Sequence, residues 1–150
     1  MNSWIDLHQY IPEIKGSIIH VLSTPINEFS SLLETLGFRV FVIDGSKIID
    51  EATFFDEFAR VLEFPAYFGH NWGAWDDSLG EFIHSIPERV AIVWQSADKS
   101  FANDPQSFLQ VICDLYNIAA SVTLKYSSLN RVEGKQVEVF ILIQDILKII

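Results

Sequence analysis

The sequence predicts an α/β domain with a small, mostly parallel β-sheet, and three observations lead to that fold class. Four short runs rich in Val, Ile and Phe have the length and composition of strands: residues 18–22, 38–43, 90–94 and 137–143. The last three runs are apolar at consecutive positions, which is typical of strands covered on both faces. Segments with helical spacing separate the runs, and this alternation favours parallel strands joined by helices.

Two helices are expected before the centre of the chain. The first covers residues 27–36, where Phe and Leu recur every three or four positions, and it ends at Gly37 because glycine suits the residue after a helix. The second carries one apolar stripe from Phe54 to Leu62. It is expected to end before Pro65, because proline pushes the preceding residue out of helical geometry.

Two further helices are expected in the second half, giving four in total, or five if the C-terminal tail is also helical. Asn71 is a suitable N-cap for a third helix that runs to about His84. Asp104 followed by Pro105 opens a long fourth helix, whose apolar face continues to about Leu129. The polar segment 95–103 is expected to be a loop.

The chain of 150 residues has the size of one domain and contains no repeat, low-complexity tract or linker. We expect a single domain over 1–150, divided into an N-terminal strand and helix (1–37), a core (38–143) and a C-terminal tail or short helix (144–150). The sheet then contains three core strands and one extra strand from the N-terminal part.

Composition limits the partners. Apolar residues make up 49% of the chain, which excludes a disordered protein. The formal net charge is −10, from 20 acidic and 10 basic residues. A surface of that sign repels phosphates, so we expect no direct binding to nucleic acid. It attracts a basic protein and accelerates their encounter.

The single cysteine, Cys113, lies in the apolar stretch SFLQVICDLY and is expected to be a buried core thiol. One cysteine excludes an internal disulfide and indicates a reducing compartment. The first residues lack the basic and apolar regions of a secretory signal, and no apolar run approaches the roughly 20 residues that cross a bilayer. We therefore expect a soluble protein of the cytoplasm with no membrane contact.

The third helix has two different sides. At about 100° per residue, its apolar side holds Trp72, Trp75, Leu79, Phe82 and Ile83. Its opposite side holds Gly73, Asp77, Gly80 and His84, with Asp76 near the edge. Two glycines in a helix cost roughly 1 kcal/mol each relative to alanine. Close approach of another protein to the helix backbone explains them, and so does a short, frayed helix.

The stretch FPAYFGHNWGAWDDSLGEF, residues 64–82, has an ordered set of features: a proline, a tyrosine-bearing loop, Gly-x-Asn, then a helix with an aspartate and a leucine. In that order it resembles the barstar family of ribonuclease inhibitors, and the resemblance runs from about Val40 to the last strand. It implies a barstar-like fold, an inhibitor rather than an enzyme, and no cofactor. The implied partner is a basic, barnase-like ribonuclease or ribonuclease toxin domain, which an immunity protein blocks.

The resemblance also implies contact residues. Asp77 matches the family aspartate that enters the ribonuclease active site, where a carboxylate takes the place of an RNA phosphate. Tyr67 matches a loop tyrosine that packs on the enzyme's catalytic histidine, and Asp114 matches an acidic residue that reaches a basic side chain. Gly69 and Asn71 match positions that shape the loop and begin the helix.

Three positions depart from the family pattern. Gly73 stands where a second aspartate is usual, Asp76 where a hydrophobic residue is common, and His70 where the residue varies and is often charged. With Gly80, they complete the predicted partner-binding set. Asp76 lies roughly 60° around the helix from the lost aspartate and offers a charge in a different place. This fits a partner with a different arrangement of arginines, and it fits a relative that has lost the inhibitory contact.

Two other functions stay open. One is a barstar-like acidic scaffold for a non-nuclease partner. The other is an enzyme that uses His70, Asp77 and His84 for acid–base chemistry, but no Ser, Cys or Lys nucleophile accompanies them, so we expect no catalysis. The four histidines lack metal-ligand spacing, and Asp76 and Asp77 diverge by about 100° on the helix, so no metal site is expected.

Overall fold

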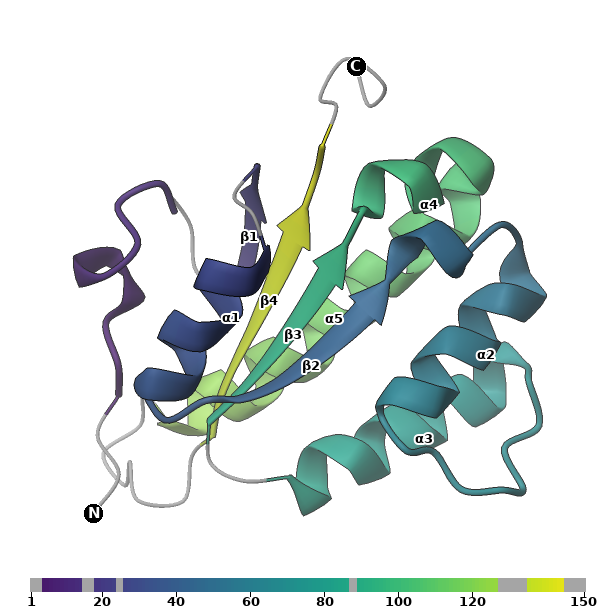
Figure 1. The fold of residues 1–150 in the computed structure, drawn as a ribbon. Coiled ribbons are helices and arrows are strands. Elements are labelled where there is room, and N and C mark those ends of the chain that lie inside the picture. The colour runs from purple at the N-terminus through teal and green to yellow at the C-terminus, as the bar shows by residue number, and fades with distance from the viewer. Residues whose placement is uncertain (1–3, 15–17, 24–25, 87–88, 127–134, 145–150) are drawn as a thin grey trace.

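The computed structural model describes residues 4–14, 18–23, 26–86, 89–126 and 135–144, and its centre is a parallel sheet of four strands (Figure 1). The strand order is β1-β4-β3-β2, and all three neighbouring pairs are parallel. The strands are β1 (Ile19–Leu22), β2 (Arg39–Asp44), β3 (Arg89–Gln95) and β4 (Gln136–Leu142). The predicted α/β class is confirmed, and so is the extra N-terminal strand, which forms one edge of the sheet.

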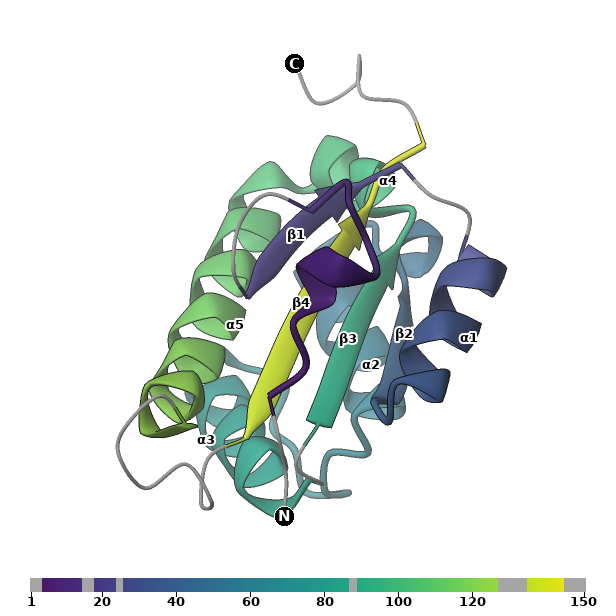
Figure 2. The same cartoon turned by 90° about the vertical axis from the view of Figure 1, so that its left-hand side faces the viewer.

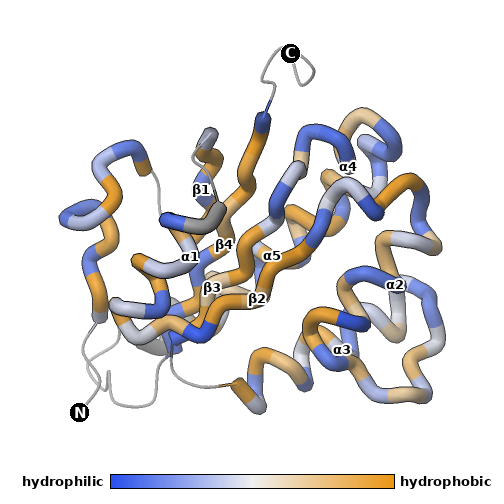
Figure 3. Tube along the Cα trace, viewed as in Figure 1, coloured by the Kyte–Doolittle hydropathy of each residue, from blue (hydrophilic) through white to orange (hydrophobic). Residues whose placement is uncertain are grey.

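The two central strands are buried on both faces. All seven residues of β4 are buried, as are the five between the ends of β3. Ile92 in β3 lies beside Phe41 of β2 on one side and Val139 of β4 on the other. Figure 3 shows β2 and β3 largely in the hydrophobic colour. Burial on both faces explains why these strands read as continuous apolar runs.

Three helices cover one face of the sheet: α2 (Glu51–Val61), α3 (Trp72–Ser85) and α5 (Pro105–Tyr126). The core beneath them contains large, fully buried rings, including Phe54, Phe58, Trp75 and Trp94. Trp94 donates its indole N–H to the Ser100 hydroxyl at 3.1 Å, so its polar atom is satisfied. Burial of each such side chain stabilises the fold by roughly 1.5–3 kcal/mol.

The N-terminal part of the chain covers the opposite face (Figure 2). It consists of the short 3-10 helix η1 (Leu7–Gln9) with its flanking residues, and α1 (Ile26–Thr35). Their buried side chains are Leu7, Ile11, Ile14, Phe29 and Leu33, and they pack on Ala91, Val93, Phe140 and Leu142 of the central strands. The strand-and-helix arrangement predicted for this region is present, and η1 adds to it.

A buried polar network fastens this N-terminal layer to β4. The Gln136 side chain accepts a hydrogen bond from the Ile5 N–H at 2.9 Å and donates to the Ile5 carbonyl at 2.8 Å. It also donates to Glu138, whose other carboxylate oxygen lies 2.7 Å from His20 Nε2. His20 is thus a buried histidine with a partner, on the edge strand.

The helix ends follow the predicted signals. Gly37, at φ +91°, ends α1, and the Phe38 N–H donates to the Leu33 carbonyl. The Asp104 carboxylate accepts a hydrogen bond from the Ser107 N–H at 3.1 Å and so caps α5. The expected end of this helix near Leu129 and the expected tail from residue 145 lie outside the described residues. No helix in the described ranges is long and apolar enough to span a membrane.

Two predictions were wrong. Segment 95–103 is not a loop, because residues Ala97–Asn103 form helix α4. Two of its polar side chains are buried: Ser100 donates to the Gly45 carbonyl, and Asp98 accepts from the Gln144 N–H. Cys113 is not a core thiol but is exposed, because it lies about 200° around α5 from Val111, which is buried.

Candidate functional site

The site begins in the loop between α2 and α3. Glu63 ends α2 with φ +57°, and a turn follows in which the Phe68 N–H donates to the Pro65 carbonyl at 2.9 Å. Phe68 is buried, whereas the neighbouring Tyr67 is 79% exposed. The loop is therefore anchored by one ring and presents the other to solvent.

His70 connects this loop to α2. Its Nε2 lies 2.8 Å from the Asp56 carboxylate and its Nδ1 lies 3.1 Å from the Phe68 carbonyl. The imidazole packs against the Phe68 ring at 4.8 Å, and the His70 backbone has φ +51°. Two residues further along the chain, Trp72 makes a second contact with α2 by donating its indole N–H to the Glu51 carboxylate. Both contacts hold the loop that carries Tyr67 against α2.

Asn71 begins α3, as predicted. Its side-chain oxygen accepts a hydrogen bond from the Ala74 N–H at 2.8 Å, and its side-chain amide donates to the Gly69 carbonyl at 3.1 Å. A Cβ atom on Gly69 would lie only 3.0 Å from that amide nitrogen. Gly69 and Asn71 therefore shape the backbone that leads into the helix.

The outward side of α3 is exposed and has few side-chain contacts within the described residues. Asp77 is exposed, and its side chain has no hydrogen bond or ion pair within the described residues. A Cβ atom on Gly80 would meet open space, and one on Gly73 would make only an ordinary contact with Asn71. Packing within the molecule thus does not require either glycine. Their cost in helix stability calls for a reason outside the described chain.

Asp76 and Asp114 share a hollow between α3 and α5. Leu79, Asn117, Ile118 and Ser121 complete its lining. The Asp114 carboxylate accepts hydrogen bonds from Trp75 Nε1 at 3.0 Å and from the Gln110 side chain at 3.1 Å. Partial burial raises the pKa of Asp76, and the negative charges of Asp114 and Asp77 raise it further. A cation placed in this hollow would relieve that repulsion.

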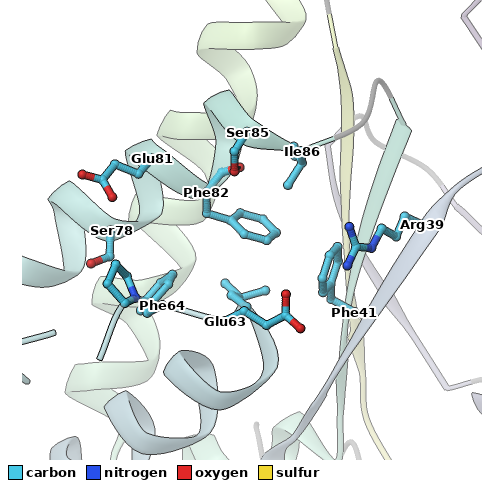
Figure 4. Close-up of a pocket in the computed structure, with 11 residues that line it drawn as sticks. Arg39, Phe41, Glu63, Phe64, Ser78, Glu81, Phe82, Ser85 and Ile86 are labelled. Atoms are coloured by element: carbon cyan, nitrogen blue, oxygen red, sulfur yellow. The ribbon is translucent and has the colours of Figure 1, made fainter. Parts of the chain in front are cut away.

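A different cavity, of about 260 Å³, lies on the other flank of α3 (Figure 4). Its walls include Phe41 and Phe82, while Arg39 enters from β2 and Glu63 from the loop after α2. The Arg39 guanidinium lies 4.8 Å from the centre of the Phe41 ring. Ser78, Ser85 and Glu81 of α3 also line this cavity, and no histidine, cysteine or lysine does.

The acid–base alternative does not match the geometry. His70 is turned toward Asp56 on α2 instead of Asp77, and both of its ring nitrogens face acceptors. His84 is exposed in the last turn of α3. Within the described ranges, no group of three His, Cys, Asp or Glu side chains is arranged to hold a metal ion.

A known protein family matches most of the chain. The family model of barstar, the barnase inhibitor, matches residues 38–146. The chain belongs to the barstar family. A search of curated proteins gave no significant match. The barstar match includes β2, β3, β4 and every predicted partner-binding residue, and it leaves the N-terminal layer outside.

Eight of the nine predicted partner-binding residues lie together, in the loop and on α3: Tyr67, Gly69, His70, Asn71, Gly73, Asp76, Asp77 and Gly80. The ninth, Asp114, comes from α5 and faces the same hollow as Asp76. The sequence interpretation missed the two carboxylates on α2, Asp56 and Glu51, that hold the loop. Both occupy exposed helix positions, and only the packed loop reveals their contacts.

Proposed function

We propose that this chain binds the active site of a basic, barnase-like ribonuclease or ribonuclease toxin domain and blocks it, as an immunity protein of the cytoplasm. Membership of the barstar family supports the class of partner. The observation that carries the proposal is Asp77, an exposed carboxylate with no partner among the described residues, between two glycines that packing within those residues does not need.

In the proposed complex, Asp77 takes the place of an RNA phosphate. A ribonuclease active site offers cationic donors to a phosphate, and a carboxylate accepts the same charge-assisted hydrogen bonds. Gly73 and Gly80 leave the backbone on either side of Asp77 uncovered, so that the enzyme surface approaches closely. RNA is then excluded because its site is filled.

Tyr67 is proposed to add apolar contact area beside Asp77. Tyrosine buries a large ring with little loss of rotamer freedom and keeps a hydroxyl for hydrogen bonding. The contacts from His70 to Asp56 and from Trp72 to Glu51 hold its loop before binding. Such preorganisation lowers the entropy lost on association.

The hollow between Asp76 and Asp114 is proposed to receive an arginine or lysine of the partner. The ion pair between that cation and Asp76 or Asp114 replaces the ion pair that Gly73 cannot make, and it lies closer to α5. Desolvation raises the pKa of Asp76, the negative charges of Asp114 and Asp77 raise it further, and a cation from the partner would offset the repulsion among these three charges. The proposed partner therefore differs from barnase in where its cations lie.

The test is an inhibition assay against a panel of barnase-type ribonucleases and ribonuclease toxin domains. The expected result is complete loss of RNA cleavage by at least one enzyme at an equimolar amount of this protein. Association should slow as salt is added, because the chain carries a net charge of −10. If every enzyme keeps its activity, ribonuclease inhibition is wrong for this panel, and the acidic scaffold for a non-nuclease partner becomes the better account.

A further inference from the structure

The cavity of about 260 Å³ between β2 and α3 combines an apolar floor with a charged rim (Figure 4). Its floor contains Phe41, Leu62 and Phe82, which are all buried. The rings of Phe41 and Phe82 meet edge to face, with their centres 5.1 Å apart. Arg39 and Glu63 stand at the rim and are both exposed. Small-molecule sites in proteins have this composition, an apolar lining with a few polar groups that fix orientation.

Arg39 and Glu63 carry opposite charges but do not pair. Neither side chain takes part in an ion pair within the described residues. The Arg39 guanidinium instead lies 4.8 Å from the centre of the Phe41 ring. Figure 4 shows the Glu63 carboxylate turned toward Arg39 and Phe41. The cavity therefore presents one cation and one anion beside the same apolar floor.

The backbone at Glu63 is held in a conformation that is unusual for glutamate. Glu63 follows the end of α2 and has φ +57°, a position where glycine or asparagine is common. The Phe64 N–H donates to the Ala59 carbonyl at 3.0 Å and closes this turn. A side chain at such a position costs backbone strain. The turn fixes the point from which the carboxylate projects toward the cavity.

We propose that this cavity binds a free α-amino acid with an apolar side chain, and an aromatic side chain most tightly. The planar Arg39 guanidinium donates two parallel hydrogen bonds to the carboxylate of the ligand. Glu63 accepts hydrogen bonds from the ammonium group of the ligand. The side chain lies on the floor, where a ring packs edge to face against Phe41 or Phe82.

Charge and size select this class of ligand. An organic anion without an amine is attracted by Arg39 but repelled by Glu63 and by Glu81, which is also exposed at this cavity. An amine without a carboxylate is repelled by Arg39. Drug-sized ligands occupy pockets of roughly 300–1,000 Å³, so this cavity suits a smaller molecule. The inference does not rest on the proposed inhibitor function.

Titration of the full chain with L-phenylalanine, followed by the NMR shifts of backbone amides, tests the site. The amides of Arg39, Phe41 and Phe82 should shift saturably, with millimolar affinity because the rim charges are exposed to water. Hydrocinnamate lacks the amine and phenethylamine lacks the carboxylate, so each should bind at least tenfold more weakly. Absence of a saturable shift, or equally tight binding of either analogue, would overturn the proposal.

Two substitutions assign the charged contacts. Arg39→Gln and Glu63→Gln should each weaken L-phenylalanine binding at least tenfold, with an unchanged far-UV circular dichroism spectrum. Lys47→Gln and Glu34→Gln remove the same charges from exposed positions elsewhere, and both should bind as the wild type does. Glu63→Gln should also bind hydrocinnamate more tightly than the wild type does, because one repelling charge is gone. Unchanged L-phenylalanine affinity in either cavity variant would contradict the assigned contacts.

Discussion

Helices α3 and α5 pack on the same face of the sheet, yet the surfaces that they present to solvent differ in chemical character. The buried sides are alike, with Trp75 and Leu79 on α3 and Leu115 on α5 in one apolar core. Outward, α3 presents aspartates and glycines, whereas α5 presents Leu109, Cys113 and Tyr116. Both outward surfaces depart from what folding alone favours, one through helix glycines and the other through exposed apolar side chains.

The difference shows that the core of the fold leaves the outward residues of both helices free to differ. An acidic, uncovered helix backbone suits a basic partner that approaches closely. The exposed apolar residues of α5 carry no charge that would attract a basic partner. Substitutions on the outward side of α3 are therefore expected to weaken binding of a basic partner, whereas substitutions of the exposed apolar residues of α5 are not.

The largest effects are expected where the two helices are alike. Leu79→Ala on α3 and Leu115→Ala on α5 should each lower the free energy of unfolding by about 2–5 kcal/mol, because both side chains are almost fully buried in the same core. Urea unfolding measures the effect. A cost below about 1 kcal/mol for only one of them would show that the two helices do not share a core.

Asp77→Ala should lower the affinity for the ribonuclease identified in the panel at least 100-fold. Loss of one member of a buried charge pair costs about 3–5 kcal/mol in general, and tenfold in affinity corresponds to about 1.4 kcal/mol. The melting temperature should change little, because the carboxylate is exposed and unpaired in the described chain. As a control, Glu34→Ala removes the same charge from an exposed position on α1. An equal loss of affinity in Glu34→Ala would show that Asp77 contributes only through the net charge of the chain.

Gly80→Ala should stabilise the protein by about 1 kcal/mol and weaken the ribonuclease complex. The added methyl group meets open space on α3 and removes the helix penalty of glycine, but it stands between the helix backbone and the partner. Gly37→Ala is the contrasting control, since φ +91° makes that glycine necessary for the fold and the variant should be less stable. Tighter binding by Gly80→Ala would contradict close approach of the partner.

Asp76→Asn should give the smallest effect, a slight rise in melting temperature at pH 7. The pKa of Asp76 is raised in the folded state, so folding is favoured as pH falls through that pKa and disfavoured above it. The gain from Asp76→Asn should therefore fade as the pH is lowered. Asp50→Asn should have the opposite sign at pH 7, because hydrogen bonds from Thr53 lower the pKa of Asp50 and stabilise its charged form.

Much of the fold was predictable because short-range patterns and burial agree. The apolar runs that became β3 and β4 are buried on both faces, and the signals at Gly37, Asn71 and Asp104 lie at real helix ends. Helix α4 was missed because its polar composition indicated solvent. In the fold, Ser100 and Asp98 instead satisfy backbone groups of distant segments.

The candidate site, like the fold, could be predicted from the sequence only in part. Exposure of Asp77 follows from helix geometry alone, and the structure agrees. Placement of Asp76 beside Asp114 requires that α3 pack against α5, and sequence spacing within one helix carries no such information. The same holds for His70, whose contact with Asp56 depends on a left-handed backbone conformation that few sequence patterns reveal.

The most direct test of separate surfaces on α3 and α5 is an RNA-cleavage titration with the wild type, Asp77→Ala and Leu109→Glu side by side. Wild type and Leu109→Glu should abolish the activity of the panel ribonuclease at one inhibitor chain per enzyme. Asp77→Ala should leave it active at the same ratio. Undiminished inhibition by Asp77→Ala, or loss of inhibition in a folded Leu109→Glu variant, would contradict the assignment of ribonuclease binding to α3.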